Sequence, residues 1–569
     1  MTGLIFTKIS VIVLNFFSLF RVSLPTGILE KCINFFWKNP RTVEYMASHV
    51  RSEELERLGR ILAVHRFKKV LPVTPALNDF YEEKTKKVEN YNDFKKLPES
   101  NKENYVKKFP LEYRCINGCL PEKGTLYKSA GTSGKNTAWA HSLEDELFFA
   151  KYVAFGLNYN YRTDNRNFKI INCWAFGTWP TAIDFTKGAT SVGQMINVGT
   201  NMKEAIEMLL MLGKNYRYLI VGYPPFLSGL FAQGKKVGIN WKDWYIHVLC
   251  GGESFVEEWR EEIKNYLGEE TLIYSAYGST DLGLGEGMEN ALTVTIRRIA
   301  HVYQTFWDDE NKARVLAKKY FPEISSNQIL PKEKEEVRRL FLRLFMTDPA
   351  VDRRLPMIFQ YDPTSYFNEE VVSKTEDGRD VSEMLTTVIW KDTAIPRVRY
   401  NIKDERGIIK HKEMFKILKS FNIDIKKVLI SLKVDRNILH LPFFYIFGRS
   451  DGTISIDGAN IFPADVEELI ADNEEFDFIS SFIMKRTDDR RLGFDFELKA
   501  GIDIPNNSSL IKKKFKNKLA EYSSGFKELY EEKLDCSNLA IEFFSFRTGP
   551  FVENPLEASR LVKYKYVRK

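Results

Sequence analysis

Short apolar runs alternate with amphipathic stretches through the middle of the chain. The runs lie at 169–176, 218–222, 247–250 and 272–277. Each is short enough to be a buried strand, and the stretches between them have helical periodicity. Strands that alternate with helices predict a largely parallel sheet with helices on its faces. Because ligands bind beyond the carboxyl ends of the strands in such sheets, we expect a site in the residues that follow these runs.

The stretch after the third run predicts one of these helices in detail. Its apolar residues recur at every fourth position, as Phe255, Trp259, Ile263 and Leu267. Gly268 follows the last of them and predicts the end of the helix. Ser254 and Glu257 have the spacing of a capping box, so we expect them to start the helix.

The pattern of the chain changes at residue 448. Beyond it we expect a strand at 453–456, a helix at 464–470, a hairpin of 478–485 and 493–499, a further helix and a strand at 539–546. The further helix has Ile511, Phe515, Leu519 and Tyr522 on one face. This βαββαβ order is typical of a small α+β domain. The pattern therefore predicts an apolar N-terminal segment (1–44), a large domain (45–447) and a small C-terminal domain (448–569).

Two charged regions of the large domain show no chemistry of their own. Residues 295–345 are helical in pattern, and we interpret them as an insertion whose apolar stripe includes Val337, Leu340 and Phe341. The lysines of 84–87 and 95–108 are expected on solvated helix faces.

The N-terminal segment is apolar over 4–20 apart from Lys8, Asn15 and a few hydroxyls. This length is at the lower edge for spanning a bilayer, and Lys8 would lie inside the membrane. Arg21 and Val22 follow instead of the small residues of a signal-peptide cleavage site. We favour a helix buried against the body of the protein. An interfacial membrane helix over 1–24 and a true anchor remain alternatives.

Composition and charge narrow the class of protein. The chain has 569 residues, 44% of them hydrophobic and 28% charged, which favours a folded protein with a large core. A net charge of +7 over this length does not indicate a nucleic-acid partner. The six cysteines are scattered, as is typical of a reduced protein. We therefore expect a cytoplasmic protein, with association to a membrane left open.

The first candidate motif is a loop of small and hydroxyl residues after an expected strand. It reads Ser129, Ala130, Gly131, Thr132, Ser133, Gly134 and Lys135. Such a loop presents backbone and hydroxyl donors to phosphate oxygens, and its lysine adds charge. It is not a Walker loop, because Ser129 stands where the first glycine would fall. This disfavours a kinase-type nucleotide enzyme.

The second motif, Tyr277-Gly278-Ser279-Thr280-Asp281, stands at the end of an expected strand. An aromatic ring can stack on a purine, a hydroxyl can reach a phosphate, and a carboxylate can hold Mg²⁺. Upstream, Gly251, Gly252 and Glu253 end the preceding strand, and their glycines allow a ligand to approach the backbone closely.

Two further motifs follow. One is 395–400 with Asp404 beyond it, and the other is 448–451 followed by 457–467, which includes Gly458. Asp404 and Arg449 together could hold ribose hydroxyls from two sides.

These four blocks, in this order, resemble the adenylate-forming superfamily of acyl-CoA synthetases and adenylation domains. Within it they look most like the phenylacetate–coenzyme A ligase-like group, over about residues 110 to 480. The resemblance implies an α/β fold with a large multi-sheet adenylate-forming N-terminal domain and a small, mobile α+β C-terminal domain.

The resemblance also implies a role for each matched residue. The implied ATP-binding residues are Ser129, Gly131, Thr132, Ser133, Gly134, Lys135, Gly251, Gly252, Glu253, Tyr277, Gly278, Ser279, Thr280, Asp404 and Arg449. Thr280 would also act in catalysis at the α-phosphate, and Asp281 would hold Mg²⁺. Asp451 would be the hinge of the small domain, and Gly458 would lie near the tunnel of the acyl acceptor.

The chain departs from the family pattern at several positions. Asp281 replaces the usual glutamate, Asn136 a common proline, and Gly452 a second acidic hinge residue. The catalytic C-terminal lysine normally follows a glycine, a context that is missing here. Lys563 and Lys565 are the candidates for its role.

We therefore expect ATP- and Mg²⁺-dependent activation of a small carboxylic acid as an acyl-adenylate, followed by acyl transfer to coenzyme A. Transfer to an amine or a carrier-protein thiol is an alternative. A non-catalytic relative that serves as a binding or membrane-associated protein is another. Trp174, Phe176 and Trp179 could line an apolar acyl pocket, and packing in the core explains them equally well.

Overall fold

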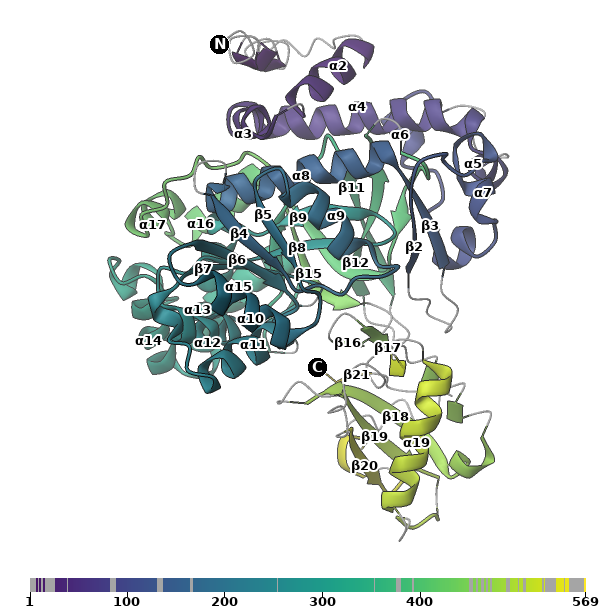
Figure 1. Ribbon diagram of the computed structural model, residues 1–569, viewed down its shortest axis with the longest axis vertical. Coiled ribbons are helices and arrows are strands. Elements are labelled where there is room, and N and C mark those ends of the chain that lie inside the picture. The colour runs from purple at the N-terminus through teal and green to yellow at the C-terminus, as the bar shows by residue number, and fades with distance from the viewer. Residues whose placement is uncertain are drawn as a thin grey trace. The chain divides into compact units, whose positions relative to one another are not determined.

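The computed structural model describes most of the chain (Figure 1). The described residues are 7, 8, 10, 11, 14, 15, 26–37, 39–81, 88–129, 137–163, 167–252, 254–350, 352, 354–374, 380–390, 393–449, 454–456, 459–461, 465, 466, 469, 470, 473–487, 492–499, 501–504, 508–523, 526, 527, 539–546, 548–551, 567 and 568. They form two compact units, the first made of 1–127, 138–371 and 382–448 and the second of 128–137, 372–381 and 449–569.

A nine-stranded sheet is the centre of the first unit, with the strand order β14-β15-β10-β9-β8-β7-β6-β4-β5. Its strands are β4 (Phe168–Asn172), β5 (Gly193–Asn197), β6 (Arg217–Gly222), β7 (Tyr245–Gly251), β8 (Ile273–Ser279), β9 (Gly283–Met288), β10 (Met357–Gln360), β14 (Asp404–Ile409) and β15 (Phe443–Arg449). Strands β5, β4, β6, β7 and β8 pair in parallel. The parallel sheet predicted from the apolar runs is therefore confirmed.

Helices cover both faces of the parallel strands, as the sequence pattern predicts. One face packs against α10 (Met202–Leu212), α11 (Pro224–Lys236) and α12 (Glu257–Leu267) through residues such as Ile220 and Val248. The opposite face packs against α8 (Leu143–Tyr161) and α9 (Pro180–Ala189) through their neighbours Leu219 and Leu249. Alternate residues of a strand point to opposite faces, so a strand buried on both sides is apolar throughout.

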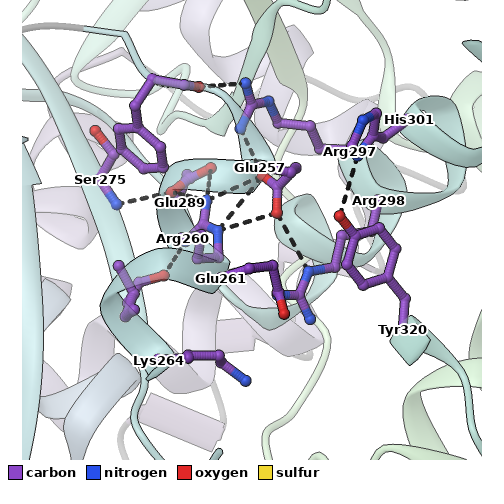
Figure 2. Close-up of polar contacts among 12 residues, drawn as sticks. Glu257, Arg260, Glu261, Lys264, Ser275, Glu289, Arg297, Arg298, His301 and Tyr320 are labelled. Atoms are coloured by element: carbon purple, nitrogen blue, oxygen red, sulfur yellow. Dashed lines mark hydrogen bonds and ion pairs between the residues drawn. The ribbon is translucent and has the colours of Figure 1, made fainter. Parts of the chain in front are cut away.

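The start of α12 differs from the prediction. The helix begins at Glu257, its capping residue is Val256, and no side chain caps it. The Glu257 side chain is drawn away by arginines, with Arg260 Nε at 3.2 Å and Arg297 Nη1 at 2.5 Å from its carboxylate oxygens. Figure 2 shows Glu257 at the centre of this buried network. The capping-box spacing was therefore misleading, because a tertiary ion pair takes the carboxylate.

The network of Figure 2 also joins the expected insertion to the sheet. This region forms α13 (Ala291–Asp308), α14 (Glu310–Tyr320) and α15 (Lys334–Phe345). It shares a core with α16 (His411–Ser420), α17 (Ile425–Ser431) and the strands β10 and β15. The predicted apolar stripe of Val337, Leu340 and Phe341 is fully buried in that core. The helices thus pack on the sheet through a continuous apolar surface.

The N-terminal part of the first unit is helical. Its helices are α2 (Thr26–Phe36), α3 (Pro40–His49), α4 (Ser52–Val70), α5 (Pro75–Tyr81), α6 (Tyr91–Phe94) and α7 (Leu111–Arg114). In the segment before them, Val11 and Leu14 are buried. Asn15 donates to the carbonyl of His49 and accepts from the amide of Arg51, each at 3.0 Å. These residues therefore pack where α3 meets α4.

Among the described residues, no helix combines the length and the apolar character needed to cross a bilayer.

A smaller sheet and a hairpin complete the first unit and lead into the second. The sheet has the order β1-β13-β12-β11, from β1 (Ser100–Asn101), β11 (Tyr366–Lys374), β12 (Asp380–Val388) and β13 (Tyr400–Asn401). The hairpin consists of β2 (Gly124–Ser129) and β3 (Thr137–Ser142). Strand β1 is parallel to β13, with Ser100 opposite Tyr400.

The second unit is an α+β structure around a four-stranded sheet with the order β20-β19-β18-β21. It comprises β16 (Ile454–Ile456), β17 (Ala459–Ile461), β18 (Ile479–Arg486), β19 (Leu492–Leu498), α19 (Ser508–Tyr522), β20 (Ala540–Phe544) and β21 (Val567–Arg568). The predicted hairpin, helix and late strand are confirmed. Phe515 and Leu519 of α19 are buried against Phe494 and Phe496 of β19, as the helical spacing predicts.

Candidate functional site

The ends of β7 and β8 bring two of the sequence motifs together. In the parallel pairing of these strands, Gly251 lies opposite Ala276, the residue before Tyr277. Gly252 has φ +83°, and a Cβ there would lie 2.4 Å from the ring of Tyr223. A side chain at 252 is therefore excluded both by the backbone conformation and by this packing. The glycine keeps the backbone bare at the carboxyl edge of the sheet, where ligands bind in folds of this kind.

Tyr277 is the aromatic residue of this edge. Its ring packs against Phe359 and Phe444, with centroids 5.8 and 5.3 Å away. Its hydroxyl donates a hydrogen bond to Oδ2 of Asp404. Burial raises the pKa of the Tyr277 phenol well above its ordinary value, and the Asp404 carboxylate adds to the rise. The phenol therefore stays protonated and remains a donor to Asp404.

Asp281 ends the same motif and makes the reciprocal contact. Tyr400 donates a hydrogen bond to Asp281 Oδ2 at 2.6 Å. The motifs 277–281 and 400–404 are thus joined at both ends, since the tyrosine of each binds the aspartate of the other. Both aspartates are buried, at 6% exposure each. A buried carboxylate needs such partners, because it has lost its hydration.

Lys102 is a cation of this site that the sequence did not reveal. Its Nζ lies 3.7 Å from Asp281 Oδ2, and its side chain is only 20% exposed. The prediction of a solvated face for the lysines of 95–108 is therefore wrong for this residue. Lys102 is brought here because β1, which ends just before it, pairs with β13, which begins at Tyr400. That pairing has no local signal in the sequence.

The residues around Asp281 are compatible with a magnesium ion. Mg²⁺ in nucleotide sites binds one or two carboxylates together with substrate phosphates and water. Tyr400 and Lys102 both contact Oδ2, so Oδ1 is the oxygen through which Asp281 would hold the ion. In the described part of the chain, no group of three or more acidic, histidine or cysteine side chains is arranged to bind a metal.

The remaining described residues of the motifs make hydrogen bonds and close packing contacts that hold the local backbone in place. Ser279 Oγ accepts from the amide of Leu282 at 3.1 Å, which closes the turn that contains Thr280. A Cβ at Gly278 would lie 2.7 Å from the carbonyl oxygen of Gly283, so the strand pair leaves no room for a side chain. Ser129 Oγ and Thr137 Oγ1 lie 2.7 Å apart at the base of the hairpin.

Several predicted site residues lie outside the described residues. These are Gly131, Thr132, Ser133, Gly134, Lys135, Glu253, Asp451, Gly458, Lys563 and Lys565. Arg449 ends β15, and its side chain is not described. The proposed partnership of Arg449 with Asp404 therefore stays a prediction.

Two of the aromatic residues after β4 differ in burial, and their expected role in an acyl pocket stays a prediction. Trp174 is 3% exposed and packs edge-on against Phe185 at 4.9 Å, so it belongs to the core. It still lies close to the site, because a Cβ at Gly251 would be 3.4 Å from its ring. Phe176 is 42% exposed.

Comparison with known proteins defines the fold. No protein-family model matches the chain. No curated protein matches its sequence. A crystal structure of 2-hydroxyisobutyryl-CoA ligase in complex with 2-HIB-AMP and CoA, in the thioesterification state, is similar with a TM-score of 0.55 and 11% identity, over 91% of this chain and 90% of the ligase. A second structure of that ligase, in the postadenylation state with R3-HIB-AMP, has a TM-score of 0.46 and 10% identity, over 89% and 88% of the two chains.

The first of these similarities confirms the expected fold class. The chain has the α/β fold of an adenylate-forming ligase, with a large multi-sheet part. The similarity does not test the resemblance to the phenylacetate–coenzyme A ligase-like group, which stays a prediction. At 11% identity the likeness concerns the fold alone.

Proposed function

We propose that the protein activates a carboxylic acid with ATP, forms an acyl-adenylate and pyrophosphate, and then transfers the acyl group to coenzyme A. The observation that carries this proposal is the double link between the motifs 277–281 and 400–404. Tyr277 binds Asp404, and Tyr400 binds Asp281, at the carboxyl edge of the parallel sheet. Two segments that each resemble a nucleotide-binding motif of one superfamily are thus in direct contact.

The described residues suit the binding of ATP. The bare backbone of Gly251 and Gly252 and the ring of Tyr277 would flank the adenine. Asp404 would accept hydrogen bonds from the ribose hydroxyls, since an ionised carboxylate is an acceptor only. Thr280 would bind the α-phosphate, and Lys102 would add positive charge beside it. Arg449 and the loop residues 129–135 would complete the contacts to ribose and phosphates.

The reaction needs no nucleophilic side chain, because the substrate carboxylate is the nucleophile. One of its oxygens attacks the α-phosphorus, the bond to the bridging oxygen of pyrophosphate breaks, and pyrophosphate leaves with the electron pair. Negative charge spreads over the phosphate oxygens, so donors already aimed at them lower the barrier. A Mg²⁺ ion held by Asp281 would supply charge neutralisation at those oxygens. Lys563 or Lys565 would assist this step.

In the second step the thiolate of coenzyme A attacks the acyl carbonyl, and AMP leaves. Rotation of the C-terminal unit about Asp451 would remove the lysine from the site and bring Gly458 to the acceptor. Such a rotation separates the two half-reactions in time. An amine or a carrier-protein thiol could take the place of coenzyme A without any change in the first step.

ATP–pyrophosphate exchange tests the proposal directly. The full-length protein is incubated with Mg-ATP, labelled pyrophosphate and a panel of aryl, short-chain and fatty acids. We expect exchange that depends on one class of acid. A folded protein that catalyses no exchange with any acid would favour the non-catalytic alternative. With an accepted acid in hand, parallel reactions with coenzyme A, amines and a carrier protein identify the acceptor.

A further inference from the structure

Arg406 is a buried arginine for which no sequence motif accounts. It lies on β14, two residues after Asp404, and its side chain is 0% exposed. Its Nη1 pairs at 2.8 Å with Glu286 of β9, which is equally buried. A buried ion pair of this kind is often no more stabilising than an apolar pair of the same volume. Its presence beside the proposed nucleotide site therefore calls for a second role.

The second contact of Arg406 indicates that role. The same Nη1 donates to the hydroxyl oxygen of Tyr277 at 3.3 Å, and the guanidinium carbon lies 5.6 Å from the centre of the Tyr277 ring. A guanidinium group has donors only. The Tyr277 oxygen must therefore accept from Arg406, and its single proton points away from the arginine. That proton is the one donated to Asp404.

The other end of the guanidinium is held as well. Nη2 donates to Thr386 Oγ1 at 3.3 Å, and Thr386 Oγ1 also contacts Glu286 Oε1 at 3.1 Å. Arginine presents its donors in a rigid planar fork, so contacts at both nitrogens fix its orientation. Glu286 and Thr386 thus hold Arg406, Arg406 orients the Tyr277 hydroxyl, and that hydroxyl binds the Asp404 carboxylate.

We propose that Arg406 is a positioning residue of the nucleotide site that selects for a ribose with free hydroxyl groups. It holds the Tyr277 hydroxyl as a donor to Asp404, and this keeps the Asp404 carboxylate in the orientation that accepts the ribose hydroxyls. The inference rests on the proposed function, because it takes Asp404 as the residue that binds ribose. Arg406 itself does not touch the nucleotide. Its effect is on the binding of the nucleotide and not on the chemical step.

The informative variant is Arg406→Lys. Lysine keeps a positive charge opposite Glu286, so no buried carboxylate loses its ion pair. A lysine is a single point donor and does not reproduce the planar fork that contacts Tyr277, Glu286 and Thr386 together. The matched control is Arg354→Lys, because Arg354 pairs at 2.8 Å with Glu405, the neighbour of Asp404 on the same strand. If Arg406→Lys fails to fold, the double variant Arg406→Met/Glu286→Gln removes both charges of the pair.

The measurement compares ATP with 2′,3′-dideoxy-ATP by isothermal titration of the full-length protein. We expect the wild-type protein to bind ATP about 10-fold more tightly than the dideoxy analogue, as for the loss of one charge-assisted contact. Arg406→Lys should reduce this preference to about twofold by weakening the binding of ATP, while Arg354→Lys keeps it. In steady-state assays the KM for ATP should rise and kcat should stay within about twofold of wild type. If the substitution merely loosened the fold, it would weaken the binding of ATP and of the dideoxy analogue equally. That result would overturn the proposal.

A double-mutant cycle with Tyr277→Phe completes the test. If Arg406 acts through the Tyr277 hydroxyl, Arg406→Lys should have little further effect on ATP affinity in the Tyr277→Phe background. Equal losses in both backgrounds would overturn the inference and leave the proposed function intact. A folded wild-type protein that binds neither nucleotide would instead overturn the proposed function.

Discussion

Tyr400 donates a hydrogen bond to Asp281 across 119 residues of sequence, at 2.6 Å. The bond from Tyr277 to Asp404 runs in the opposite sense across 127 residues. Each motif begins with its tyrosine and ends with its aspartate four positions later, so the two segments lie side by side with reversed polarity. This reciprocal arrangement defines the candidate site.

Asp404→Ala should weaken the use of ATP without unfolding the protein. Removal of the carboxylate eliminates charge-assisted hydrogen bonds to the ribose, worth about 1.5–3 kcal/mol, which is roughly a 10- to 150-fold loss of kcat/KM for ATP. The measurement is ATP–pyrophosphate exchange over a range of ATP concentrations, with a thermal melt to check the fold. Asp424→Ala is a suitable control, since Asp424 caps helix α17 and belongs to neither of the linked motifs. Unchanged kinetics would show that Asp404 has no part in nucleotide binding.

Asp281→Asn should raise the Mg²⁺ concentration needed for half-maximal exchange by about 10-fold. The amide keeps the shape of the side chain and an acceptor for Tyr400, but it lacks the charge that favours a divalent cation. Titration of Mg²⁺ at fixed ATP measures the effect, and chelation of the metal should abolish exchange in the wild type. A Mg²⁺ requirement equal to that of the wild type would place the metal ligand elsewhere.

His411 should make the fold sensitive to acid. Burial lowers its pKa to about 4, and the neighbouring His440 adds to the shift. The unfolded chain binds this proton with a pKa of about 6.5. The contribution of the neutral side chain to stability is therefore complete above about pH 6.5 and is lost as the pH falls from there to about 4.

The size of this effect is at most about 3 kcal/mol over that pH range. His411→Phe, which suits the adjacent rings of Phe415 and Phe443, should flatten the dependence. Urea unfolding at pH 7, 6 and 5 compares the two proteins. An equal loss of stability in both would assign the acid sensitivity to other groups.

Deletion of residues 1–24 should lower the thermal midpoint and leave adenylation intact. Val11 and Leu14 are 4% and 2% exposed, so the deletion uncovers part of the core. The linked motifs 277–281 and 400–404 come from other parts of the chain. Melting, pyrophosphate release and co-sedimentation with anionic liposomes are compared for the full-length and shortened proteins.

Asn15→Ala is the milder companion to this deletion, because it removes only the contacts to His49 and Arg51. Its expected cost is about 1 kcal/mol. Liposome binding by the full-length protein that the deletion abolishes would support the interfacial helix instead. Loss of adenylation in a folded, shortened protein would show that the segment supports the site.

Local patterns in the sequence were sufficient to predict the strands and helix faces whose burial follows from the spacing of apolar residues. The apolar runs at 218–222 and 247–250 became β6 and β7, because a strand buried on both faces must be apolar throughout. The four-residue spacing of Phe515 and Leu519 identified the buried face of α19, because side chains four positions apart lie on the same side of a helix. The capping box at Ser254 failed, because the Glu257 carboxylate pairs with Arg297, 40 residues further along the chain.

The sequence by itself determined which short segments resemble nucleotide-binding motifs and the order in which they occur. Only the tertiary structure decided that Tyr277 binds Asp404 and that Tyr400 binds Asp281. It also decided that Lys102 lies beside Asp281 and that Arg406 donates to Tyr277. The reason is that these contacts depend on which strands become neighbours. Local periodicity encodes whether a segment is a strand and which of its faces is buried, while the pairing of β1 with β13 joins segments about three hundred residues apart.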